Sequence, residues 1–197
     1  MPALRVFVDK AIIATVCTDG YEILSMQVSG TLVDEEFAKL DVTGGKYSGD
    51  ADTNHLIWVS EMPLQAGQTI AVEMLEDAAT SFPGKTIDEL FPSDNSTEIE
   101  AFKLTSEMFD ELRNKSKTRD RIAFHLSSSS DTSVDGHIAG EDHGFGFSVL
   151  WDAGRPTSAR VSLHSYTLDS LQHNGPLRYY VKEKLGIGNS VLLKLFA

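Results

Sequence analysis

Hydrophobic and polar residues alternate in two short stretches of the first half of the chain, Leu4–Val8 and Ile70–Met74. A period of two places every second side chain on the same face, which is typical of a strand that buries one face and exposes the other. The dipeptides Gly67-Gln68 and Gly188-Asn189 each precede an apolar run and predict turns. The pattern predicts five or six short strands in each half of the chain, as in small sandwiches and open barrels.

The two halves also resemble each other. Residues 56–75 align without a gap with residues 177–196, a separation of 121 that brings Gly67 onto Gly188. Three further segments align: 40–43 with 161–164 at the same separation, 20–23 with 144–147 at 124, and 4–8 with 122–126 at 118. The changes in residue separation between the aligned segments fall in polar stretches, where a longer or shorter loop changes the free energy of folding little. This repeat predicts two similar modules related by internal duplication.

The predicted fold is therefore mainly β (α+β at most), with two similar β-sandwich or open-barrel modules, residues 1–78 and 122–197. A helical connector, residues 79–121, is expected between them. Thr86 and Glu89 have the spacing of a capping box, and Pro92 should end this short helix. A longer helix that ends near Lys117 is predicted from two features. Thr97 and Glu100 have the spacing of a second capping box, and an apolar stripe follows at helical spacing: Ile99, Phe102, Phe109 and Leu112.

The formal net charge of −12 is spread unevenly. Residues 1–78 hold 13 acidic and 4 basic residues (−9), residues 79–121 hold 9 and 7 (−2), and residues 122–197 hold 7 and 6 (−1). The negative electrostatic field of such a chain repels nucleic acid and anionic membrane surfaces, so we expect neither as a partner. It favours a basic protein partner.

Cysteine content and the N-terminal region indicate where the protein works. The chain has one cysteine, Cys17, so it cannot form an intramolecular disulfide. The apolar stretch 11–17 is too short for a signal peptide and lacks a small-residue cleavage site. We therefore expect a cytoplasmic protein.

The densest group of potential metal ligands is His137, Glu141, Asp142 and His143. Two histidines and a carboxylate could hold zinc, iron or manganese. Glycines around the group favour a solvated loop, and the aligned residues 16–19 contain no histidine. We therefore predict no metal, no cofactor and no catalytic residue. A metal-dependent enzyme that uses the His137–His143 loop stays open as an alternative.

Aromatic residues suggest a second alternative, a β module that binds a carbohydrate or another small ligand. Trp58, Trp151, Tyr179 and Tyr180 could form a stacking platform on a sandwich, although core packing requires large aromatic residues as often. Trp58 aligns with Tyr179 in the repeat. Phe147, in the same scheme, is expected to face the core.

The leading hypothesis is a non-enzymatic interaction protein whose acidic first module docks a basic protein partner. Its candidate contact residues are the run Asp34, Glu35 and Glu36, together with Asp50 and Asp52. The second copy replaces the segment that carries this run with a shorter one, and such a difference between copies is where function can diverge. One concrete version is a bacterial immunity or inhibitor protein that neutralises a cationic toxin. The sequence leaves the oligomeric state open.

Overall fold

The computed structural model describes residues 1–47, 54–92 and 105–197. Alternation in the sequence becomes alternation of burial in the strands: β6 (Thr69–Leu75) buries Ile70, Val72 and Met74 and turns the residues between them outward. Strand β1 (Ala3–Val8) buries Leu4, Val6 and Val8 in the same way. Both of these stretches are therefore strands, as their period predicts.

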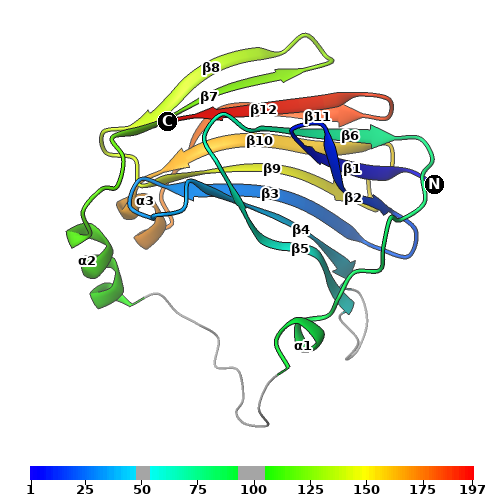
Figure 1. Cartoon of the computed structure of the whole chain (residues 1–197), viewed down its shortest axis with the longest axis horizontal. Coiled ribbons are helices and arrows are strands. Elements are labelled where there is room, and N and C mark those ends of the chain that lie inside the picture. The colour runs from blue at the N-terminus through cyan, green and yellow to red at the C-terminus, as the bar shows by residue number, and fades with distance from the viewer. Residues whose placement is uncertain (48–53, 93–104) are drawn as a thin grey trace.

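In the described part of the chain, twelve strands form two six-stranded antiparallel sheets (Figure 1). The order in sheet A is β2 (Ala11–Cys17), β1, β6, β12 (Ser190–Phe196), β7 (Arg121–Ser128) and β8 (Ser133–Ala139). The order in sheet B is β11 (Arg178–Gly186), β10 (Ser158–Tyr166), β9 (Gly144–Asp152), β3 (Ile23–Thr31), β4 (Ala38–Lys46) and β5 (Asn54–Leu64). The predicted mainly β class is confirmed.

Each half of the chain contributes three strands to each sheet. The halves meet at two seams, where β6 pairs with β12 (Val72 opposite Val191) and β3 pairs with β9 (Val28 opposite Phe147). Outward from each seam, equivalent strands of the two halves follow in the same order. In sheet A, β1 and β7 flank the seam strands and β2 and β8 lie outermost. In sheet B, β4 and β10 flank the seam strands and β5 and β11 lie outermost. This order agrees with a duplicated unit, and the duplication itself stays a prediction.

The strands of one half lie on one side of the sandwich. Residues 80–85 join the outer strands of the first half: Ser81 N–H donates to the Thr15 carbonyl on β2 (2.9 Å), and Lys85 exchanges two backbone hydrogen bonds with Ile57 on β5 (2.8 and 2.9 Å). On the other side, the Tyr180 hydroxyl of β11 donates to the His137 carbonyl of β8 (3.1 Å). The two halves therefore share both sheets instead of forming separate sandwiches.

Between the sheets lies one apolar core. Phe147 is fully buried, as expected from the repeat, and Phe145 on the same strand is buried beside it. Gly146, between them, turns toward the outer face of sheet B, where a side chain would collide with the His164 ring (2.8 Å to Cε1). The alternation thus places two aromatic rings inside and leaves room for an imidazole outside.

Three short helices lie in the described residues, α1 (Ile87–Leu90), α2 (Ser106–Asn114) and α3 (Leu168–Gln172). The predicted capping box of α1 is confirmed, with Thr86 and Glu89 each bonded to the other's backbone N–H. For α2, the observed cap is Thr105 and the buried residue is Phe109. The cap predicted at Thr97, with Glu100, Ile99 and Phe102, lies outside the described residues. Helix α3 was not expected from the sequence.

None of the helices described is long and apolar enough to cross a membrane.

Truncation of Phe147 should show how strongly the core holds the two halves together. We expect Phe147→Ala to lower the free energy of unfolding by about 3–5 kcal/mol, because the substitution leaves a cavity beside the β3–β9 seam. The control is Gln27→Ala, an exposed position on β3, for which we expect a change within about 0.5 kcal/mol. Urea unfolding of both variants measures the difference, and similar values for the two would contradict this view of the core.

Candidate functional site

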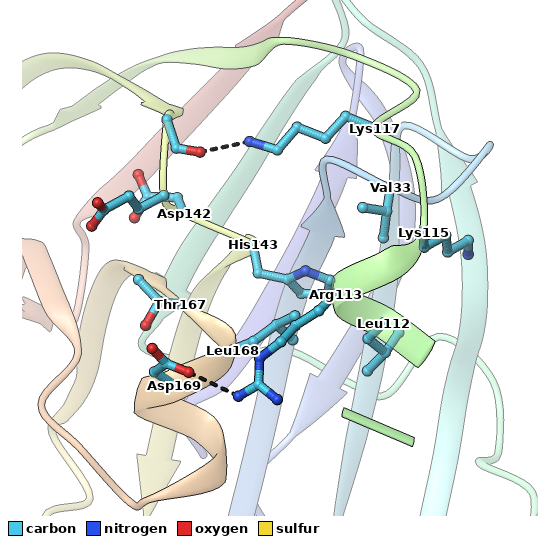
Figure 2. A pocket seen from close by; sticks show the side chains of 12 residues that line it. Val33, Leu112, Arg113, Lys115, Lys117, Asp142, His143, Thr167, Leu168 and Asp169 are labelled. Atoms are coloured by element: carbon cyan, nitrogen blue, oxygen red, sulfur yellow. Dashed lines mark hydrogen bonds and ion pairs between the residues drawn. The ribbon is translucent and has the colours of Figure 1, made fainter. Parts of the chain in front are cut away.

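A polar hollow lies at one end of the sandwich, where the β3–β4 loop, α2, the β8–β9 turn and α3 meet (Figure 2). Its volume is about 410 Å³. Its titratable lining residues are Arg113, Lys115, Lys117, Glu141, Asp142, His143 and Asp169. Two segments that the sequence singled out, the run 34–36 and the His137–His143 segment, therefore approach the same end of the molecule.

The cations of this hollow are used to hold the helices in place. Arg113 on α2 bonds Asp110 (2.9 Å) and Asp169 at the start of α3 (2.8 Å), and it also contacts Gln172. Lys117 donates to the Gly140 carbonyl in the β8–β9 turn (2.6 Å), as Figure 2 shows. These cations already have partners within the protein, so they are poorly placed to hold an external anion.

Asp34, the first residue of the acidic run, is also paired within the protein. Its carboxylate accepts hydrogen bonds from the Thr31 hydroxyl (2.8 Å) and from Lys115 (3.1 Å). Burial alone would raise the pKa of Asp34, but these two hydrogen bonds outweigh burial and hold the pKa below its usual value. Asp34 therefore anchors the loop to the end of the connector.

The remainder of the loop is fixed through its backbone. Arg119 donates to the carbonyls of Thr31 (2.7 Å) and Glu35 (3.0 Å), and its guanidinium lies 5.5 Å from the centre of the Phe37 ring. Thr118 donates to the Asp34 carbonyl (2.7 Å). These contacts hold the loop backbone while the side chains of Glu35 and Glu36 point to solvent.

The exposed acids of this loop continue onto sheet B. Lys39 on β4 bridges Glu36 (3.2 Å) and Glu61 on β5 (3.4 Å), and the Glu61 N–H donates to the Asp41 carboxylate (2.8 Å). We call Glu35, Glu36, Asp41 and Glu61 the acidic edge; with Lys39 its formal charge is −3. Asp41 and Glu61 were missed in the sequence, because only the β4–β5 pairing brings them to the run. Asp50 and Asp52 lie outside the described residues.

His143 points into the hollow from the β8–β9 turn (Figure 2). Its backbone joins the end of β10 to the β3–β4 loop, since its N–H donates to the Tyr166 carbonyl (2.8 Å) and its carbonyl accepts from the Leu32 N–H (2.9 Å). Burial lowers the pKa of the half-buried imidazole, so the neutral form is favoured near pH 7. Burial also raises the pKa of the neighbouring Tyr166 phenol. His143 and Tyr166 are thus neutral polar groups in a packed position.

The candidate metal ligands do not form one site, although Glu141 and Asp142 line the hollow together with His143. His137 lies on strand β8 with its side chain exposed, instead of in a loop. Asp142 is buried, and its carboxylate accepts from the Ser165 hydroxyl (2.8 Å) and the Ala139 N–H (3.3 Å). No group of three or more His, Cys, Asp or Glu residues suited to a metal ion is found in the ranges that the structure describes.

The four aromatic residues considered as a stacking platform differ in burial, so they do not form one exposed surface. Trp58 and Trp151 are buried, and their indole N–H groups donate to the carbonyls of Phe82 and Pro156 (both 3.1 Å). Tyr180 packs against the core, whereas Tyr179 is 43% exposed. Of the four, Tyr179 alone presents its ring to solvent. The equivalence of Trp58 and Tyr179 in the repeat therefore does not extend to their burial.

Comparison of the chain with models of known protein families, with curated proteins and with solved structures finds no match. The charge and geometry of its own residues are what point to a function.

The protonation of His143 should make stability depend on pH. Its pKa is lower in the folded than in the unfolded protein, so the unfolded chain binds the proton first as the pH falls below about 6.5. The free energy of unfolding should therefore decrease from pH 7.5 to pH 5.5. In His143→Gln this decrease should be smaller than in the wild type. Chemical unfolding at a series of pH values, with the exposed His173→Gln as control, measures it; identical slopes for wild type and His143→Gln would contradict the assignment.

Proposed function

We propose that the protein is a non-enzymatic binding protein that docks a basic protein partner on the acidic edge, Glu35, Glu36, Asp41 and Glu61. The observation that carries the proposal is the continuity of this edge: Lys39 links Glu36 of the β3–β4 loop to Glu61 of β5, and the Glu61 backbone N–H donates to the Asp41 carboxylate of β4. Glu35 and Glu61 are exposed, and Glu36 retains half of its exposure in its ion pair. The edge can therefore accept cationic side chains from solvent.

The strand order adds a long-range contribution. The strands of each half lie on one side of both sheets. The described residues of 1–78 hold 11 acidic and 4 basic residues and residues 122–197 hold 7 and 6, so the two sides carry unequal charge. A field of this kind attracts a basic partner and orients it toward the acidic side before contact. It speeds association more than it strengthens the final complex.

Short-range recognition would fall to the exposed carboxylates. Arginine suits them best, because its planar guanidinium can form two parallel hydrogen bonds with one carboxylate. The backbone contacts of Thr118 and Arg119 hold the loop before binding, so little loop entropy is lost on docking. Lys39 holds the Glu36 and Glu61 carboxylates near each other and limits the net charge that the partner must neutralise.

An immunity or inhibitor protein is the concrete form of this proposal. A toxin that acts on nucleic acid needs a cationic surface for phosphate, and a row of carboxylates on a rigid scaffold can occupy that surface. The proposed mechanism is steric and electrostatic blocking, with no chemical step on either protein.

Neutralising the acidic edge should weaken this interaction. We expect the variant Glu35→Gln/Glu36→Gln/Asp41→Asn/Glu61→Gln to bind a basic partner at least about tenfold more weakly, and with a shallower salt dependence, because it lacks the charge that attracts the partner. The substitutions keep side-chain shape, and the amide oxygen that Asp41→Asn introduces can still accept the Glu61 backbone N–H. Partners are captured from lysate with the wild-type protein, and their affinities for each variant are then measured at two salt concentrations.

The matched control removes four exposed acids elsewhere, in Glu111→Gln/Asp120→Asn/Asp131→Asn/Glu141→Gln. Its net charge equals that of the test variant, so it separates a local contact from the overall field. The proposal requires the control to bind much more tightly than the test variant. Equal affinities of the two variants, or a captured partner that is itself acidic, would refute it.

A further inference from the structure

A basic hollow lies on the outer face of sheet B, on the side opposite the acidic edge. It has a volume of about 440 Å³, within the range of small-ligand sites. Its cations are Arg155, Arg160, Lys182 and Lys184, and its floor includes Ser148 and Ser162. Four cations in one concave area are unexpected on a chain with a net charge of −12.

The strand register forces these cations together. Arg160 on β10 lies directly opposite Lys184 on β11, and Lys182 lies opposite Ser162. Like charges directly opposite each other on neighbouring strands destabilise a sheet. One carboxylate, Asp152, offsets the repulsion with a contact of 3.6 Å to Arg160. Glu183 also borders the hollow: its Oε2 accepts from Thr132 (2.6 Å) and Ser128, and its Oε1 is buried with no hydrogen-bond partner among the described residues.

Cation–π and ring–ring contacts order the floor of the hollow. Lys182 Nζ lies 3.4 Å from the centre of the Tyr179 ring, and that ring lies 5.4 Å from the His164 ring. His164 in turn lies over Gly146, which has no side chain to displace it. The Ser148 and Ser162 hydroxyls are hydrogen-bonded to each other (2.9 Å), and this pair leaves one O–H free as a neutral donor between the cations. Lys182 is therefore held in place before any ligand arrives.

We propose that this basic hollow binds a small molecule carrying phosphate or sulfate groups. Tetrahedral oxyanions accept several hydrogen bonds at once, which matches an arginine fork, two lysines and a hydroxyl. The ligand is small, because the acidic edge on the same sheet repels an anion long enough to cross the face. This site is separate from the acidic edge, and its ligand does not depend on the protein partner proposed there.

Titration calorimetry of the full chain with pyrophosphate, in a low-salt buffer free of phosphate, tests the site. We expect binding with a Kd of about 1 mM or lower, and a loss of at least about tenfold in Arg160→Gln/Lys184→Gln. The matched control, Arg121→Gln/Lys194→Gln, removes two cations from sheet A and should bind as the wild type does. Pyrophosphate should likewise raise the melting temperature of the wild type and the control but not of the Arg160→Gln/Lys184→Gln variant, which also shows that each protein is folded.

Three results would overturn the proposal, and two of them concern pyrophosphate. One is no detectable binding of pyrophosphate at about 10 mM, far above the expected Kd. The other is an equal loss of affinity in both double variants, which would mean that pyrophosphate responds to net charge instead of to the hollow. Glucose 6-phosphate and glucose 6-sulfate then distinguish the two sources of the oxyanion, with glucose as the neutral reference; binding of glucose as tight as that of both esters would also overturn it.

Discussion

Backbone pairing at the two seams is the constraint on which the rest of the structure depends. Without the β6–β12 and β3–β9 ladders, each half would be two three-stranded sheets with long, unpaired inner edges. Joining the halves satisfies those edges and makes one apolar core of both. It also fixes which charges are neighbours, because every position on the outer faces is set by register from the seams.

The charge pattern follows from this constraint. On the outer face of sheet B, acids gather on β4 and β5 and cations gather on β10 and β11, with serine and glutamine side chains on the central strands. A net charge alone describes such a surface poorly. The chain is acidic as a whole, yet it presents a concave basic area on one side, and the two areas can select ligands of opposite sign.

Much of the fold could be predicted from local patterns, and much of the site could not. The period of two in β1 and β6 and the Thr86–Glu89 capping box are local, so the sequence contains them in full. The pairs Asp34–Lys115 and Lys39–Glu61 join residues far apart along the chain, and only strand pairing and the path of the connector bring them together. His137 was expected in a loop because glycines surround it, but its pairing with Ala123 makes it part of a strand. Trp58 and Trp151 were considered for an exposed platform, but the core required their volume.

The position of β12 has a consequence for the order in which the protein folds during synthesis. This strand lies between β6 and β7, so sheet A stays in two pieces until the ribosome has passed residue 196. Strand β6 can pair with β1 at once, but more than a hundred residues separate it from its second neighbour, β12. Closing so long a loop costs entropy and slows the pairing. Sheet B, by contrast, can join its halves once β9 has been made. The nascent chain can therefore join its two halves through sheet B before sheet A closes, and in that interval apolar residues of the inner faces are open to chaperones.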